Sequence, residues 1–164
     1  MSSESDKLKR DEAMALFQQA YAHQMRGELD EAIDLYKRSI EVFPTAEGHT
    51  FVGWTYSFQG RLDEAIEECV RAIEVDPTFG NPYNDIGAYL VEKDRYDEAI
   101  PWFERALTAP RYESYCFPHF NLGRVYQHKR MYHRAMEEYK KALAEDPRHL
   151  GARQAVRRLQ AMMN

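Results

Sequence analysis

The sequence contains no hydrophobic run long enough to cross a membrane. Its longest stretches without a charged side chain, residues 13–25 and 48–60, span 13 residues each, whereas a bilayer-spanning helix needs about 20 apolar residues. Cysteine is scarce, with Cys69 and Cys116 alone in 164 residues, and residues 1–7 lack the apolar core of a secretory signal. We therefore expect a cytoplasmic protein with reduced thiols and no membrane contact.

A strongly basic charge is also missing. The 22 Lys and Arg residues against 27 Asp and Glu residues give a net charge of −5. This balance argues against nucleic-acid binding, because the neutralisation of phosphates requires a basic surface. The one basic segment, residues 148–164, carries four arginines and no acidic residue, and we interpret it as the solvated face of a helix. A content of 44% hydrophobic and 30% charged residues is typical of a folded soluble domain.

Enzyme motifs are absent as well. The sequence has no phosphate-cradling glycine loop, no nucleophile elbow, no zinc-protease histidine pair and no Cys-x-x-Cys pair. Cys116, His119, His128 and His133 share one segment, but a metal site needs three or four convergent ligands. We interpret these histidines as packing or surface residues. The sequence thus predicts no catalytic residue, no metal site and no cofactor.

Four copies of one phrase recur along the chain. The phrase reads Leu-Asp-Glu-Ala-Ile at 29–33 and 62–66, Tyr-Asp-Glu-Ala-Ile at 96–100 and Tyr-His-Arg-Ala-Met at 132–136. Its alanines are separated by 33, 34 and 36 residues and are Ala32, Ala65, Ala99 and Ala135. A period near 34 residues, with apolar residues at helical spacing inside each unit, indicates two amphipathic helices per unit.

The residues around each phrase follow a longer pattern. The third unit carries Tyr83, Ile86, Gly87, Leu90, Ala99 and Phe103, and the fourth carries His119, Leu122, Gly123, Tyr126, Ala135, Tyr139 and Pro147. This pattern resembles the tetratricopeptide repeat, W-x2-L-G-x2-Y, then A-x3-F, then P. The resemblance covers about residues 13 to 147. It implies an all-α fold, a right-handed α-solenoid of antiparallel helix pairs.

The domain organisation follows from the period. We expect a polar N-terminal tail at 1–10 and a repeat domain at 11–164. The repeats fall at about 13–45, 46–79, 80–115 and 116–149, and an amphipathic capping helix at about 150–163. The last interval between alanines holds two extra residues near 111–116, which predicts a longer loop between units.

Small residues explain how the two helices of a unit can pack closely. Ala20, Gly53, Gly87 and Gly123 occupy one slot of the first helix, and they face the equally small alanines of the second helix. Cys69 stands in the slot that Tyr36, Phe103 and Tyr139 fill elsewhere, so we expect a buried thiol. Gly27 and Gly60 suit a left-handed residue at the end of the first helix. Asp94 and Arg130 replace that glycine in the last two units, where the turn conformation should be less favourable.

The resemblance implies that the first helices line a concave groove. Residues one, five and eight positions past the aromatic slot then point into it. The predicted contact residues are Phe17, Tyr21, Gln24, Thr50, Trp54, Ser57, Asn84, Ala88, Phe120, Asn121 and Arg124. The aromatic and arginine side chains among them are of the kind that anchors protein interfaces. Phe17 and Phe120 have an alternative position, packed under the neighbouring helix, because a shift of one residue turns a side chain by about 100 degrees.

We expect a non-catalytic module that binds a protein or peptide ligand in this groove, with Tyr21, Trp54 and Phe120 as anchors. The carboxylate clamp of some co-chaperones in the family is not matched, since Phe17, Tyr21 and Phe51 replace clamp residues. One alternative is a self-associating homo-oligomer that uses the same groove, for example for Met162 and Met163 of a neighbour. Another is a helical-repeat RNA binder, against which the acidic net charge argues.

Overall fold

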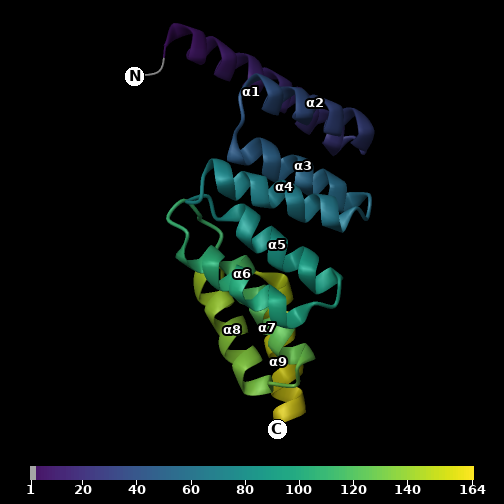
Figure 1. The fold of residues 1–164 in the computed structure, drawn as a ribbon. Coiled ribbons are helices and arrows are strands. Elements are labelled where there is room, and N and C mark those ends of the chain that lie inside the picture. The colour runs from purple at the N-terminus through teal and green to yellow at the C-terminus, as the bar shows by residue number, and fades with distance from the viewer. Residues whose placement is uncertain (1–2) are drawn as a thin grey trace.

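The computed structural model describes residues 3–164, which form nine α-helices (Figure 1). These are α1 (Glu4–Met25), α2 (Leu29–Val42), α3 (Ala46–Phe58), α4 (Leu62–Val75), α5 (Asn81–Glu92), α6 (Tyr96–Thr108), α7 (Cys116–His128), α8 (Tyr132–Glu145) and α9 (Leu150–Met163). Consecutive helices pair antiparallel and the pairs stack from the N-terminus to the C-terminus (Figure 1). The fold is the right-handed α-solenoid that the repeats predict.

Each unit is held together by a small residue on its first helix that lies against the second helix. In the third unit Gly87 faces the fully buried ring of Phe103, and a Cβ atom at Gly87 would lie 2.4 Å from Phe103 Cε1. Gly123 has the same relation to its partner ring in the fourth unit. In the second unit Cys69 is buried in the aromatic slot, and a Cβ atom at Gly53 would lie 3.4 Å from its sulfur. The close packing and the buried thiol are confirmed, but Gly87 and Gly123 face aromatic rings of the second helix rather than the expected alanines.

The aspartates of the repeated phrase connect neighbouring units. They lie in the first turns of α2, α4 and α6, where a negative charge interacts favourably with the helix dipole. Each one also accepts a hydrogen bond from the unit that follows, and the pairs are Gln59 with Asp30, Lys93 with Asp63, and Lys129 with Asp97. The carboxylates of the phrase therefore have structural partners on the exposed edge of the stack.

The turns inside the units adopt the left-handed backbone that their glycines indicate. Gly27 and Gly60 have φ values of 76° and 75°. Asp94 and Arg130 adopt the same conformation, with φ values of 59° and 61°. Because a Cβ atom clashes with the backbone in this region, the last two turns are strained as expected.

Replacing Arg130 with glycine should therefore raise the free energy of unfolding. We expect a gain of about 0.5–1 kcal/mol, since glycine adopts the left-handed region without a clash but is more flexible in the unfolded chain. Urea unfolding monitored by circular dichroism measures the change. The matched control is Gly60→Ala, which should lose stability. A loss of stability in Arg130→Gly would contradict the prediction.

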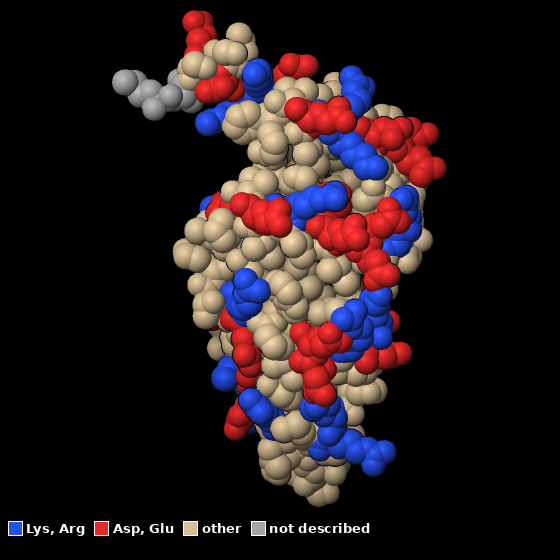
Figure 2. Space-filling view, in the orientation of Figure 1, with Lys and Arg blue, Asp and Glu red and all other residues tan. Residues whose placement is uncertain are grey.

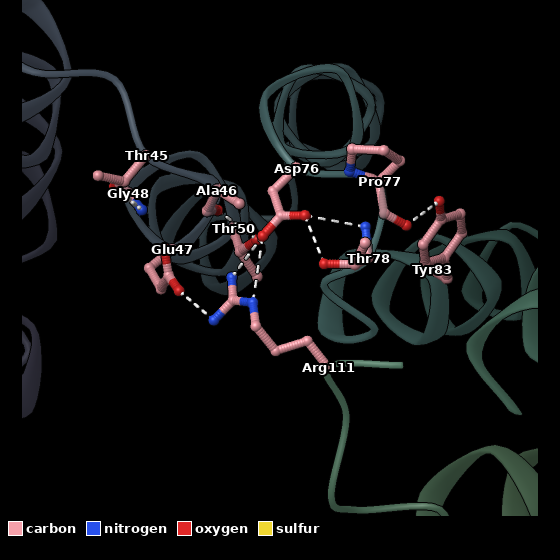
Figure 3. A network of polar contacts seen from close by, with 10 residues as sticks. All are labelled: Thr45, Ala46, Glu47, Gly48, Thr50, Asp76, Pro77, Thr78, Tyr83 and Arg111. Atoms are coloured by element: carbon pink, nitrogen blue, oxygen red, sulfur yellow. Dashed lines mark hydrogen bonds and ion pairs between the residues drawn. The ribbon is translucent and has the colours of Figure 1, made fainter. Parts of the chain in front are cut away.

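The loop between α6 and α7, residues 109–115, forms a strap across the second and third units. The amide of Arg111 donates to the carbonyl of Thr78 (2.9 Å), and the amide of Gly80 donates to the carbonyl of Arg111 (3.1 Å). The Arg111 guanidinium forms ion pairs with Glu47 (2.7 Å) and Asp76 (3.1 Å) (Figure 3). The strap thus crosses the N-terminal ends of α3 and α5, and it contains the two extra residues of the long interval.

The two ends of the solenoid differ. At the C-terminus, α9 covers the last pair and buries Ala152, Ala155 and Leu159, while the arginines of this basic helix face solvent. At the N-terminus, residues 4–10 continue helix α1 rather than forming a separate tail, and Ser3 caps the helix by accepting a hydrogen bond from the Asp6 amide. Residues 1 and 2 of the expected tail lie outside the described residues. No helix in the described range has the length and apolar character of a membrane span.

Candidate functional site

The first helices of the units form one continuous wall. Helix α3 contacts α5, and α5 contacts α7, in addition to the contacts inside each pair. The predicted contact residues lie on these helices and on α1. Charges of both signs are mixed over the face of the molecule that Figure 2 shows.

An aromatic cluster occupies the N-terminal part of this wall. We call it the aromatic track, and its members are Phe17, Tyr21, Phe51, Trp54 and Phe58. The ring of Phe51 is central, with centroid distances of 5.0 Å to Phe17, 6.0 Å to Tyr21 and 5.8 Å to Trp54. Trp54 continues to Phe58 at 5.0 Å. Tyr21 and Phe58 are 43% and 57% exposed, so the track reaches solvent along its edge.

The alternative position of Phe17 is the one observed. Its ring is partly buried and stands edge-on to Tyr36 at 5.3 Å as well as to Phe51. Trp54 is also partly buried, between Phe51 and Phe58, and it is not sealed inside the core. Tyr21 is therefore the more accessible of the two expected anchors in this part of the groove.

Two predicted contact residues are buried and do not offer their side chains to a partner. Gln24 is 5% exposed because its Oε1 accepts a hydrogen bond from the Tyr36 hydroxyl (2.7 Å) inside the first unit. Thr50 is 4% exposed, and its hydroxyl donates to the carbonyl of Ala46 (2.7 Å) within α3 (Figure 3). The Gln24 Oε1 and the Thr50 hydroxyl are thus engaged in local hydrogen bonds, while the buried Gln24 Nε2 has no partner among the described residues.

The middle of the wall is polar. Asn121 on α7 donates from Nδ2 to Oδ1 of Asn84 on α5 (3.1 Å), which links the third and fourth units. Ala88 and Ser57 are partly buried, and the Ser57 hydroxyl donates to the Trp54 carbonyl (2.6 Å). The two amides keep further donors and acceptors that a peptide backbone could use.

The C-terminal part of the wall contains a hollow of about 440 Å³ between α7 and α9. Phe120 is partly buried there, with ring centroids 5.7 Å from Tyr139 and 4.7 Å from His149. The guanidinium of Arg124 lies 5.9 Å from the centre of the Phe120 ring and is exposed to solvent. Burial raises the pKa of Tyr139 to about 12, so its hydroxyl stays protonated and donates to Gln127 (2.7 Å).

The histidines of the first helices form hydrogen-bonded pairs with glutamates. His49 Nδ1 lies 2.7 Å from Glu68 Oε2, and His119 Nδ1 lies 2.8 Å from Glu138 Oε2. Each pair joins the two helices of one unit at the slot that the repeat pattern gives to an aromatic residue. Within residues 3–164, no three His, Cys, Asp or Glu side chains come together in a way that could hold a metal ion.

Two members of the track, Phe51 and Phe58, are not among the predicted contact residues. Phe58 follows Trp54 by four residues and so lies on the same helix face, a spacing that could have identified it. Phe51 is next to the predicted residue Thr50, and the choice between the two depends on a helix rotation of about 100 degrees. The structure places Phe51 in the aromatic cluster of the wall, and Thr50 is buried.

Solved structures with the same architecture exist for other proteins. PilF of Pseudomonas aeruginosa aligns with a TM-score of 0.87 at 24% identity, over 94% of this chain and 70% of that one. PilW, described as a widely conserved type IV pilus biogenesis factor, gives 0.83 at 19% identity over 92% and 69% of the two chains. YrrB, described as a TPR protein with an unusual peptide-binding site, gives 0.70 at 19% identity over 87% and 73%. No curated protein matches the sequence.

The sequence itself matches family models along most of its length. Models described as tetratricopeptide repeat match residues 13–46, 46–79, 83–109 and 116–149. These matches coincide with the helix pairs α1–α2, α3–α4, α5–α6 and α7–α8, and α9 follows the last of them as the capping helix. The chain belongs to the tetratricopeptide repeat family.

Proposed function

We propose that this protein is a non-catalytic interaction module that binds a segment of a partner protein along its concave wall. The observation that carries the proposal is the aromatic track, in which Tyr21 and Phe58 are exposed over 43% and 57% of their surface. Aromatic side chains with an exposed edge and a packed base are typical anchors of protein interfaces.

The family supports a role in protein–protein interaction, and a neighbour of the same fold, YrrB, is described as having a peptide-binding site. In this chain the track would hold apolar side chains of the segment. Asn84 and Asn121 would bind its backbone, and Arg124 would hold a carbonyl or carboxylate group near the hollow between α7 and α9. Phe120 then packs below Arg124, where its partly buried ring supports the surface and does not act as an exposed anchor.

Replacing Trp54 with alanine should abolish binding of peptides selected from a phage-displayed random library on the wild-type protein. Removing the indole takes away the support of both Phe51 and Phe58, so the whole track loses its shape. Tyr21→Ala should weaken the same binding by about tenfold, because hot-spot aromatics contribute at least 1–2 kcal/mol. Affinity is measured by isothermal titration calorimetry.

The matched control is the other tryptophan. Trp102 on α6 packs against Tyr83 (6.3 Å between centroids) and Arg105, away from the track. Trp102→Ala and Trp54→Ala should both lower the melting temperature, since each removes a partly buried indole. Only Trp54→Ala should lose peptide binding below that temperature. Equal peptide binding by the two variants would refute the proposal that the groove is the binding site. Light scattering shows whether a second copy of the chain occupies the groove instead.

A further inference from the structure

A carboxylate without a partner lies in the middle of the wall. Asp85 on α5 occupies the position that Phe51 holds in the second unit and Asn121 in the fourth. Its side chain is partly buried, and among residues 3–164 no lysine or arginine forms an ion pair with it. The neighbouring Asn84 is the one side chain that supplies it with a hydrogen bond. The aspartates of the repeated phrase, by contrast, are paired with glutamine or lysine of the next unit.

The groups that face Asp85 carry no positive charge that would stabilise it. Helix α4 contributes Cys69, the strap contributes the buried Tyr112, and α5 itself contributes Tyr89. On the α3 and α4 side the nearest ionisable pair is the mutually bonded His49 and Glu68. On the α7 side Asn121 is neutral, and Arg124 does not act on the carboxylate. Burial raises the pKa of Asp85 to about 7.

A second polar group is left open one helical turn away. Tyr89 is 5% exposed, and its hydroxyl lies next to Ser57 but forms no hydrogen bond of good geometry with any described residue. It follows Asp85 by four residues, so the two side chains are neighbours on the same face of α5. A buried polar atom without a partner is costly and calls for a ligand or water. Both side chains thus leave hydrogen-bonding capacity on one side of the helix.

The side chain of α5 at this level of the wall is small. The equivalent position of the four units is occupied by Tyr21, Trp54, Ala88 and Arg124, in chain order. The third unit therefore has the smallest side chain there. Ala88 is partly buried and lies three residues after Asp85, on the same face of α5. A small residue between two large ones leaves space for a long side chain to reach α5.

We propose that Asp85 binds the ammonium or guanidinium group of a lysine or arginine in the partner segment. The inference rests on the proposed function, because the segment must first lie in the groove. The carboxylate accepts the hydrogen bonds of the cation, and the long apolar stem of that side chain passes over Ala88. The partner is then a segment with apolar or aromatic residues for the track and one basic residue a unit further along.

The proposal has a consequence for pH. At a pH below its folded-state pKa, the Asp85 carboxyl group is neutral and attracts a cation only weakly. At a higher pH the carboxyl group is ionised and binds the cation more tightly. Peptide affinity should therefore rise through the pKa of about 7. The expected change belongs to this one residue and should disappear when the carboxyl group is replaced by an amide.

The test uses peptides selected on the wild-type protein from a phage-displayed random library. They should share a lysine or arginine at a fixed distance from an apolar or aromatic residue. At about pH 8, Asp85→Asn should bind them at least about tenfold more weakly, the loss expected when a charge-assisted hydrogen bond is removed. Changing the basic residue of the peptide to glutamine should cause a similar loss, and the two changes together should cost little more than either alone.

The outcomes separate this inference from the proposed function. If selected peptides need Trp54 but share no basic residue, or bind Asp85→Asn as tightly as wild type at about pH 8, the groove stands and the role of Asp85 is wrong. If no peptide depends on Trp54, both proposals fail. Asparagine has the size of aspartate, so circular dichroism spectra of wild type and Asp85→Asn should coincide and a loss of binding reports the charge.

Discussion

Replacing Asp85 with asparagine is expected to make the protein more stable at about pH 8, by about 4 kcal/mol. The folded-state pKa of Asp85 is raised from 3.8 to about 7 by burial, and each pKa unit corresponds to about 1.4 kcal/mol. A raised pKa means that the folded protein binds the proton more tightly than the unfolded chain. The contribution to stability is thus fully present below pH 3.8 and is lost as the pH rises towards 7.

The measurement is the difference between the unfolding free energies of wild type and Asp85→Asn, taken from urea titrations across this pH range. Using the difference removes the opposite pH dependence of carboxylates such as Asp63 and Glu98, whose pKa values are lowered by hydrogen bonds from Lys93 and Arg95. The two proteins should be equally stable near pH 4 and diverge above it. A difference that does not change with pH would contradict the burial of an unpaired carboxyl group. Asp85 thus lowers the stability of the folded protein at neutral pH, and a role in binding explains why such a residue is present.

Gly87→Ala should have the opposite effect and cost about 3 kcal/mol, near the upper end for overpacking a close-packed core. The added Cβ atom would lie 2.4 Å from Phe103 Cε1, and the ring of Phe103 is fully buried. The ring cannot turn away without displacing the rest of the unit. Thermal and urea unfolding should both show the loss, although alanine favours a helix over glycine by about 1 kcal/mol.

Gly53→Ala is the matched control in the second unit. The slot opposite Gly53 holds Cys69, whose sulfur would lie 3.4 Å from the new Cβ atom, although the carbonyl of Ala65 would lie at 3.0 Å. The helix must shift by a few tenths of an ångström at most, so we expect a loss of about 1 kcal/mol or less after the gain in helix propensity. Equal losses in the two variants would show that the size of the opposing residue does not decide how closely the helices pack.

The repeat pattern was enough to predict the architecture. The spacing of the alanines predicted the helix pairs, and Gly27 and Gly60 predicted left-handed turns that the structure confirms. These features depend on local backbone preferences and on small residues that recur at the same position of each unit, and both can be read from the sequence. The capping helix was predicted for the same reason, because its apolar residues recur at helical spacing.

The groove was predicted less completely, because its side chains depend on contacts between distant residues. Gln24 accepts a hydrogen bond from Tyr36, a residue of the second helix. This contact cannot be inferred from the helix that carries Gln24. The position of Asp85 shows the same difficulty, because its burial results from α4, the strap and α5 together.

The most direct test of the account is the map of a bound peptide on the protein. The amide resonances of the ¹⁵N-labelled protein are followed by NMR while a peptide selected on the wild type is added. We predict that the shifted resonances belong to α1, α3, α5 and α7, with the indole of Trp54 and the side-chain amides of Asn84 and Asn121 among them. Shifts confined to α2, α4, α6 and α8, or to the arginines of α9, would contradict a partner in the concave groove.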